Sequence, residues 1–439
     1  MDTERLLPLI YEEQNRILRC GGIERYCHHR ILAAFSSSPI KIVTGFRRSG
    51  KSWLCRQVVR DLVNQGKVVL ENVLYLNFED YRLDEIRSPA ELDAICGFFS
   101  ARVAKQGAKV LLLDEVQNVS GWERFLRGFH EREHGWQILV TGSNSELLSS
   151  EFAAKLAGRH IDFELLPFSF REVLAYRGVS IRTEADYFRH HADIGKAFEE
   201  FIAAGGLPER LTIQDPSAIQ SYLGGILSKV ILDDVIKRYR VEHVAVLERL
   251  LSFILSSPGQ VISFAALSKR LSALGNAIKT DTVIRYVGYL HSVYAVFELG
   301  RFDWKLSRLF DTTRKYYGID TGIMNLYRRT AENRSFMLEN IVYLELRRRG
   351  TIPHYGSLQK GGELDFLVPG EERRWQAVQV CTRLSDENQK RELGIFAVAE
   401  ESLKQKESLL LVEEGQKEEI AVDGIMVHML PLVRWLLVV

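Results

Sequence analysis

The first third of the chain alternates short, mostly apolar runs with stretches in which apolar residues recur at helical spacing. The runs lie at 40–44, 72–78, 109–113 and 137–142, and the best example of helical spacing is 53–65. Continuous apolar runs are typical of strands that are buried on both faces of a parallel sheet. Recurrence every three or four residues predicts helices. We therefore predict an α/β fold with a parallel sheet.

The pattern changes after the core at 1–165 and predicts three further domains. Residues 166–240 have mixed helical spacing and suit a helical lid. Residues 241–318 contain three helical segments followed by an alternating strand, which is the order of a winged helix-turn-helix. Residues 319–439 combine a helix with strands and are expected to form a separate α/β domain.

The first apolar run leads directly into the sequence Gly-Phe-Arg-Arg-Ser-Gly-Lys-Ser, which has the spacing of a phosphate-binding P-loop. Backbone N–H groups of such a loop surround the β-phosphate, and the following helix adds the positive end of its dipole. The lysine brings charge to the β- and γ-phosphates, and the last hydroxyl binds Mg²⁺. We expect ATP and Mg²⁺ to be bound by Gly45, Phe46, Arg47, Arg48, Ser49, Gly50, Lys51 and Ser52.

Two acids follow the apolar run at 109–113. Ligands of open α/β sheets bind at the carboxyl ends of the strands, so we expect Asp114 to hold Mg²⁺ and Glu115 to polarise the attacking water. Ser143 and Asn144 could sense the γ-phosphate or the attacking water, or could simply begin a loop. Arg159 could reach the charge that develops on the phosphate, or could form a surface ion pair. The phosphate that the arginine would reach could belong to its own subunit or to a neighbour.

Composition places the chain among ordinary globular proteins. It is 46% hydrophobic and 26% charged with a net charge of +1, so a nucleic-acid site would have to be a local patch. No apolar run reaches the length of a membrane span, and the charged first residues are unlike a signal peptide. The five cysteines fit reduced thiols, so we expect a cytoplasmic protein with no membrane partner.

Two histidine-rich segments are not expected to bind zinc. His130 and His134 match the HExxH pattern and would share a helix face, but the segment leads into the next strand and no third ligand is evident. A second set matches no standard zinc spacing; it consists of Cys20, Cys27, His28 and His29.

The last domain carries acids in the arrangement of a restriction-type nuclease centre. Such centres combine a helix acid, a strand acid and E-x-K on the next strand, whose carboxylates hold Mg²⁺ while the lysine supports the attacking water. Here an amide and a thiol replace the glutamate and the lysine, so we expect a retained but inactive fold. The degenerate site would consist of Glu339, Asp365, Gln379 and Cys381, with Glu363 on the same strand face and Lys390 as a substitute lysine.

Taken together, these motifs resemble a prokaryotic AAA-type ATPase family with a C-terminal restriction-endonuclease-like domain. The resemblance spans nearly the whole chain and is carried by the P-loop together with Leu-Leu-Leu-Asp-Glu-Val-Gln, Thr-Gly-Ser-Asn-Ser, Leu-Ala-Gly-Arg, Gly-Gly-Leu-Pro-Glu, Tyr-Tyr-Gly-Ile-Asp-Thr-Gly and Glu-Leu-Asp-Phe-Leu-Val. It implies ATP binding with Mg²⁺, hydrolysis, and the domain order core, lid, winged helix, nuclease-like domain. The family also tends to carry basic residues at positions such as Arg47 and Arg48. Gln379 and Cys381 depart from the nuclease pattern.

Three functions remain open from the sequence. The first is a Mg²⁺-dependent ATP hydrolase that acts as a switch or motor on DNA or on a protein partner. The second is a slow signalling or binding module that nucleotide latches, and the third is an ATP-gated DNA nuclease. DNA could bind the C-terminal domain or the winged helix. The winged helix offers four basic residues for this purpose: Lys269, Arg270, Lys279 and Arg285. Equally, the winged helix could pack against a protein partner, or the chain could form a homo-oligomer.

Overall fold

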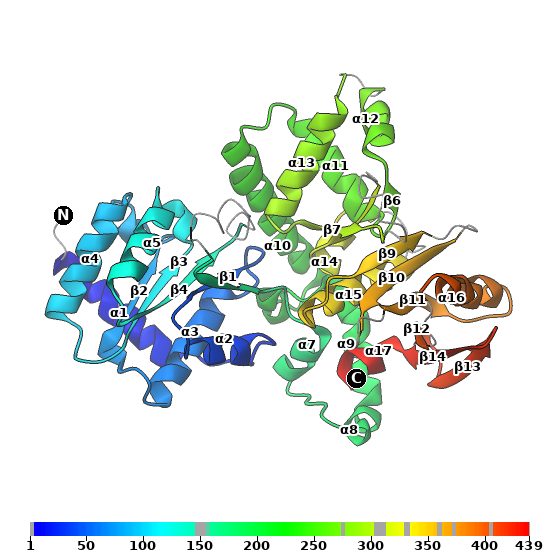
Figure 1. Cartoon of the computed structure of the whole chain (residues 1–439), viewed down its shortest axis with the longest axis horizontal. Helices are drawn as coiled ribbons and strands as arrows, with labels where there is room; N and C mark the ends of the chain where they lie inside the picture. Colours follow the sequence, from blue (N-terminus) through cyan, green and yellow to red (C-terminus); the bar gives the residue numbers. More distant parts are fainter. Residues whose placement is uncertain are drawn as a thin grey trace. The chain divides into compact units, whose positions relative to one another are not determined.

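The computed structural model describes residues 4–144, 156, 158–273, 277–302, 313–328, 334–357, 362–370, 375–403 and 407–438. The chain forms two compact units (Figure 1). The first unit holds Met1–Leu165 with Ser292–Tyr294, and the second holds Leu166–His291 with Ala295–Val439. Within the described ranges, we find no helix with the length and apolarity needed to cross a membrane.

A parallel five-stranded sheet forms the centre of the first unit. Four of its strands lie on the predicted apolar runs, whereas the strand His160–Glu164 was not predicted. The strand order is β2-β3-β4-β1-β5, so one strand separates the P-loop strand from the strand that ends in the two acids. Because all neighbours are parallel, their carboxyl ends meet at one edge of the sheet. The strands are β1 (Ile40–Thr44), β2 (Val73–Asn77), β3 (Lys109–Asp114), β4 (Trp136–Gly142) and β5 (His160–Glu164).

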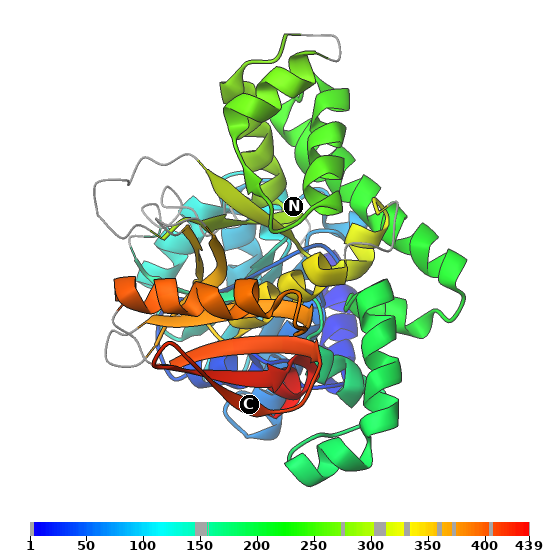
Figure 2. The same cartoon turned by 90° about the vertical axis from the view of Figure 1, so that its right-hand side faces the viewer.

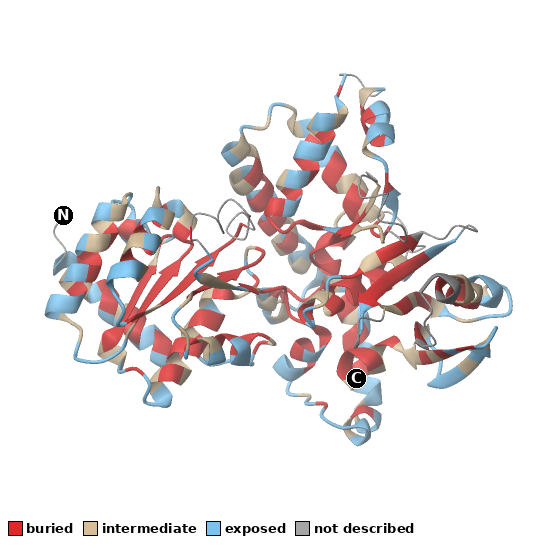
Figure 3. Cartoon of the chain, viewed as in Figure 1, coloured by how far each residue is buried: buried red, intermediate tan, exposed pale blue. Residues whose placement is uncertain are grey.

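Helices cover both faces of this sheet, which explains why strands β1 to β4 are mostly apolar. One hydrophobic cluster joins one face to α4 (Pro89–Arg102) and α5 (Trp122–Arg132). A second joins the other face to α2 (His28–Ala34) and α3 (Lys51–Asn64), and α1 (Leu7–Arg19) contributes to both clusters. In Figure 3 strands β1 to β4 are buried along nearly their whole length, whereas the helices expose their outer faces.

Helix α5 ends before the second histidine of the HExxH pattern, so the prediction that His130 and His134 share a helix face is wrong. The Glu133 N–H donates to the Phe129 carbonyl and closes the helix. The chain then turns at once, because Trp136 begins β4 and packs edge-on against the Phe129 ring. Helix α5 ends early because the packing of Trp136 starts β4 so soon. The HExxH segment therefore lacks the two histidines on one helix face that a metal site of this kind needs.

The second unit begins with helices, as expected for 166–240. A buried acid, Asp320, fixes the turn that interrupts them: the Gly206 N–H donates to its Oδ2 at 2.6 Å. A Cβ on Gly205 would lie 1.8 Å from Asp320 Oδ1, and the φ of +74° also favours glycine there. The helices are α7 (Phe170–Tyr176), α8 (Glu184–Arg189), α9 (His191–Ala204), α10 (Pro216–Lys229) and the π-helix η7 (Val230–Lys237).

Three helices and a small antiparallel sheet follow. The sheet order is β6-β8-β7, so the short first strand pairs with the last one. The three helices lie within 241–318, where regular apolar spacing predicted three helical segments. The elements are α11 (Val244–Ser256), β6 (Val261–Ile262), α12 (Phe264–Ser272), α13 (Thr280–Ser292), β7 (Val296–Gly300) and β8 (Arg314–Gly318).

A mixed six-stranded sheet of order β13-β14-β12-β11-β10-β9 completes the second unit. Helix α16, orange in Figure 2, runs along this sheet and shares a hydrophobic cluster with it. The elements are α14 (Thr321–Asn325), α15 (Arg334–Arg348), β9 (His354–Ser357), β10 (Glu363–Pro369), β11 (Trp375–Arg383), α16 (Gln389–Leu403), β12 (Glu407–Glu414), β13 (Glu418–Val422), β14 (Ile425–Pro431) and α17 (Leu432–Leu437).

Candidate nucleotide site and carboxylate pocket

The P-loop joins β1 to α3 and carries three left-handed backbone positions. Gly45, Arg48 and Gly50 have φ values of +153°, +65° and +97°. Such alternation turns successive N–H groups toward one side and makes an anion-binding concavity. Helix α3 begins at Lys51, so its N-terminus faces the same concavity and adds a positive dipole end. Strand, loop and helix follow in the order that a phosphate site requires.

Inside the loop, Lys51 turns back on its own backbone. Its Nζ donates to the carbonyls of Gly45 at 3.0 Å and Phe46 at 3.3 Å, and it lies 3.3 Å from Glu115 Oε1. The buried Ser49 hydroxyl has no hydrogen-bond partner among the residues that the structure describes. Neutral carbonyls are weaker partners for an ammonium than the oxygens of an anion, so Lys51 is available to an anion. The Ser49 hydroxyl could also donate to that anion.

The acid at the end of β3 is fully buried and firmly held. Asp114 accepts a hydrogen bond from the Tyr75 hydroxyl at 2.5 Å and another from the Thr141 hydroxyl. These two donors lie on β2 and β4, the neighbours of β3 on either side. The carboxylate of Asp114 is therefore fixed at the carboxyl edge of the sheet, in an orientation that both adjacent strands determine.

Glu115 leaves the strand in a left-handed conformation, with φ of +52°. A non-glycine residue in this region stores backbone strain, which is common at functional sites. Its Oε2 accepts from the Ser143 N–H at 3.1 Å and from Gln117 Nε2 at 2.5 Å. Burial favours the neutral acid, but the Lys51 ammonium and these hydrogen bonds outweigh it and lower the pKa of Glu115. The carboxylate is thus held ionised.

The sequence-predicted partners divide between the two edges of the sheet. Ser143 and Asn144 follow β4 directly and are buried at the carboxyl edge, the same edge as Glu115. Arg159 precedes β5, and its carbonyl accepts from the Ile40 N–H at the opposite edge, about 13 Å of strand away. There its exposed side chain pairs with Glu131. The structure does not bring Arg159 to the P-loop of its own chain.

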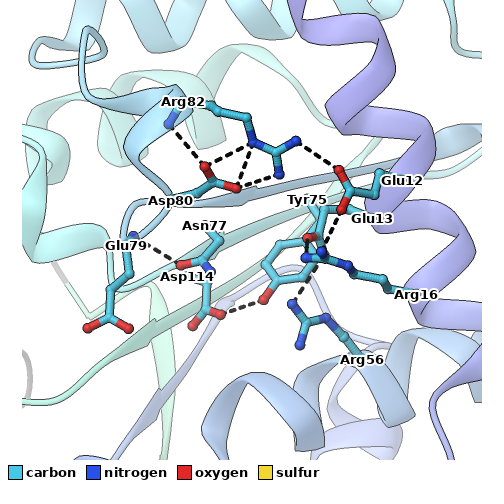
Figure 4. A network of polar contacts seen from close by, with 10 residues as sticks. All are labelled: Glu12, Glu13, Arg16, Arg56, Tyr75, Asn77, Glu79, Asp80, Arg82 and Asp114. Carbon is cyan, nitrogen blue, oxygen red and sulfur yellow. Dashed lines mark hydrogen bonds and ion pairs between the residues drawn. The ribbon is translucent and has the colours of Figure 1, made fainter.

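Tyr75 also links the site to the first helix (Figure 4). The guanidinium of Arg56, from α3, lies 4.7 Å from the centre of the Tyr75 ring and pairs with Glu13 of α1 at 3.1 Å. Burial, followed by the charge of Asp114, raises the pKa of Tyr75 well above its usual range, so the hydroxyl remains a donor. Sequence reasoning missed Tyr75 and Thr141, although each is a polar residue within an apolar strand.

Other residues tied to the loop were missed as well. The buried Arg25 donates to the Ser49 carbonyl at 2.8 Å, and Arg47 pairs with Glu79. The rejected zinc set is only partly brought together: the ligand atoms of His28 and His29 lie within 4.8 Å of each other and of Glu24, without either cysteine. His29 is already ion-paired with Glu24 at 2.6 Å.

A second candidate site lies in the second unit, where a buried lysine stands among acids. Lys315 Nζ, from β8, lies 2.7 Å from Glu363 Oε1, 3.2 Å from Glu339 Oε1 and 3.9 Å from Asp365 Oδ1. These acids line a pocket of about 890 Å³ between α15, β10 and α16. The structure therefore brings the expected helix acid and strand acids together, but around a lysine that the sequence analysis had not singled out.

The residues at the E-x-K positions do not restore a metal site. Gln379 accepts from the Asp365 N–H at 3.1 Å and donates to Glu392 at 3.2 Å, so its amide is engaged. Cys381 packs in the hydrophobic cluster beneath α16, where burial raises the pKa of its thiol to about 12. Lys390 lines the pocket but is exposed on α16.

The predicted basic residues of the three-helix segment are all exposed. They lie on α12, just before α13, and on α13 itself, which are the second and third helices of the segment. Exposure makes them available to a partner and does not by itself distinguish nucleic acid from solvent. They are Lys269, Arg270, Lys279 and Arg285.

Two separate regions of the chain match known protein families. Residues 37–174 match a protein family described as AAA domain, and residues 195–334 match a domain of unknown function, DUF8612. The chain is 30% identical over 405 residues to "Uncharacterized protein MJ1544" of Methanocaldococcus jannaschii, across 90% of this chain and 88% of that protein. An uncharacterized protein of Haemophilus influenzae is 28% identical over 331 residues, 75% of this chain and 79% of the other. Among solved structures, a Walker-type ATPase of Pyrococcus abyssi is 14% identical with a TM-score of 0.46, covering 68% of this chain and 94% of that one.

Proposed function

Because this chain belongs to the same family as the archaeal protein MJ1544 and carries an AAA domain over residues 37–174, we propose that it binds and hydrolyses ATP. The observation that carries the proposal is the meeting of Lys51 and Glu115, 3.3 Å apart at the carboxyl edge of the sheet. One residue comes from the phosphate-binding loop and the other from the end of β3. A cation for phosphate and an ionised base are therefore presented to the same space.

Each residue has a role that its contacts support. Lys51 would exchange the carbonyls of Gly45 and Phe46 for phosphate oxygens, which are stronger partners because they are charged. Glu115, released from Lys51, would orient water and accept its proton. Ser52 and Asp114 offer the hard oxygen ligands that Mg²⁺ prefers, and bound Mg²⁺ would neutralise charge on the phosphates.

The test is phosphate release from Mg²⁺-ATP by the full chain. Lys51→Ala is expected to lower turnover by about 10²- to 10³-fold, because a charge aimed at the transferring group is removed. Lys105→Ala is the matched control, since that lysine forms an exposed ion pair with Glu71 on the same unit. Turnover of the Lys51 variant equal to that of the control would end the proposal.

A nucleotide-latched binding module is the second candidate, and it rests on the consequence that the Lys51–Glu115 ion pair has for the rate. A base already engaged by an ammonium must be freed before it can act, which would slow turnover at this site. Single-turnover hydrolysis of stoichiometric ATP separates the two: the latch requires bound ATP to persist for many minutes, whereas the hydrolase converts it within seconds.

We further propose that the second unit contains a helical lid, a winged helix and an α/β domain of restriction-endonuclease-like fold. The order of α11, β6, α12, α13, β7 and β8, with β6 paired to β8, supports the winged helix. The four exposed basic residues of this segment support DNA as a partner. DNA that raises ATP turnover of the wild type but not of Lys279→Ala/Arg285→Ala would support DNA as the partner, and equal stimulation of both would contradict that assignment.

A further inference from the structure

A cation already lies among the acids of the carboxylate pocket in the second unit. The ammonium of Lys315 lies within 4 Å of carboxylate oxygens from Glu339, Glu363 and Asp365. These oxygens come from a helix and from one face of a strand, the elements from which a metal-dependent nuclease collects its ligands. The lysine thus stands at the point where the three carboxylates converge.

The lysine is fixed at this point. Its side chain is 1% exposed, and it lies on β8 between strands β6 and β7 of the small sheet. Burial favours the neutral amine, but the charges of Glu339, Asp365 and Glu363 outweigh burial and raise the pKa of Lys315 above its ordinary value. Tyr317, two residues on, donates to Glu339 at 2.6 Å and holds that acid in place.

A divalent cation does not fit the residues as they stand. Mg²⁺ needs oxygen ligands at about 2.1 Å in nearly octahedral geometry, and the space between these oxygens is filled by an ammonium of like charge. The remaining candidates cannot compensate, because Gln379 is engaged by backbone and Glu392, and the Cys381 thiol stays protonated.

We propose that Lys315 is a built-in cation that fills the divalent-metal position of this pocket and keeps it closed to Mg²⁺ and Mn²⁺. The lysine replaces the electrostatic role of the metal, since it neutralises the converging acids. It also ties β8 of the small sheet to α15 and to β10 of the six-stranded sheet. The pocket is therefore a fixed structural junction, and it lacks the metal ions that phosphodiester hydrolysis would use.

The test measures Mn²⁺ binding to the full chain without nucleotide, by the loss of the free-ion signal in electron paramagnetic resonance. The wild type is expected to show no saturable binding. Lys315→Met removes the charge but keeps the side-chain volume, and should gain saturable binding of one Mn²⁺, with an affinity at least about tenfold above the weakest binding that the assay detects. Adding Glu339→Gln to that variant should abolish the gained site.

Two controls make each outcome decisive. Lys390→Met removes a lysine from the same pocket that contacts none of the three acids in the structure, and Lys315→Arg keeps the charge at the buried position. Both should remain without saturable binding. A folded Lys315→Met chain that binds no Mn²⁺ would overturn the proposal.

The wild type provides a test that does not depend on the folding of Lys315 variants. Saturable Mn²⁺ binding by the wild type that disappears in Glu363→Gln would overturn the proposal. Glu363 suits this purpose because its side chain is 40% exposed, so the substitution leaves the fold intact.

Discussion

Two lysines in this chain meet carboxylates, and they are placed in opposite ways. Lys51 is the first residue of α3, at the end of the P-loop, where two backbone carbonyls and the acid Glu115 hold it. Lys315 lies on strand β8, where three acids surround it. Lys51 can exchange its carbonyl partners for the oxygens of a bound anion. Lys315 already has three acidic partners, so an incoming anion would offer it no stronger ones.

The contrast shows that a lysine paired with acids can either prepare a site for an anion or occupy the place of a metal ion. What differs is how many charged partners each lysine has. Removing one member of a buried, multiply paired group leaves an uncompensated charge, so such groups resist rearrangement. A lysine on loop carbonyls loses little when a phosphate replaces them. Chemistry is therefore expected at the P-loop edge and not in the carboxylate pocket.

The largest expected effect is on ATP turnover, when glutamate is replaced by glutamine at one site or at the other. Glu115→Gln should lower ATP turnover by about 10²- to 10⁴-fold while nucleotide binding persists, because the amide cannot accept a proton. Glu363→Gln should leave turnover unchanged. Phosphate release and fluorescent-nucleotide binding measure both, and a comparable loss in the two variants would remove the distinction between the sites.

The stability of the second unit should depend strongly on Lys315. Lys315→Met is expected to lower the free energy of unfolding by about 3–5 kcal/mol, since it leaves buried acids without a counter-charge. Lys390→Met, at an exposed position of the same pocket, should change it by less than about 0.5 kcal/mol. Urea titrations followed by circular dichroism measure both, and equal effects would show that the lysine is not a structural junction.

The two sites should also respond oppositely to pH. Burial and the charge of Glu339 raise the pKa of Asp365 well above its ordinary value of 3.8, so its contribution to stability is complete below about pH 4 and is lost as pH rises through the folded pKa. The pKa of Glu115 is lowered from 4.5, so its contribution is present above about pH 4.5 and is lost as pH falls through the folded pKa.

The substitutions Asp365→Asn and Glu115→Gln test this opposition. The Asn variant should gain unfolding free energy relative to the wild type as pH rises above about 4. The deficit of the Gln variant should shrink as pH falls below about 4.5. Thermal unfolding of both variants and the wild type across this range measures the trends, and parallel trends would contradict the assigned shifts.

The smallest expected effect concerns Arg159. Its exposed pair with Glu131, at the far edge of the sheet, predicts that Arg159→Ala changes ATP turnover by less than about twofold. Turnover measured at several protein concentrations checks this. A loss of tenfold or more that depends on concentration would instead show that a neighbouring subunit uses this arginine.

Local patterns explain which features were predictable from the sequence. The P-loop, β3 with its two acids and the helices α11 to α13 depend on contiguous residues, so spacing alone located them. Helix α5 ended early because Trp136 packs into the sheet, a tertiary demand that a local pattern does not carry. Arg159 looked close to the site in sequence, yet it lies at the wrong end of a parallel strand.

Lys315 and Tyr75 were missed for a common reason. Each is a buried polar residue on a strand, and its partners come from other elements: Asp114 for Tyr75, and α15 with β10 for Lys315. The choice of partner depends on which strands become neighbours, which one sequence does not reveal. A buried polar residue in a strand is nevertheless a signal, because such groups are almost always paired.

The most direct test of the account is the number of Mn²⁺ ions that the wild-type chain binds with and without a non-hydrolysable ATP analogue. The account predicts one ion per chain in the presence of the analogue and none in its absence, because the P-loop edge takes a metal with nucleotide and Lys315 fills the other position. An ion bound without nucleotide, or two ions with it, would contradict the account.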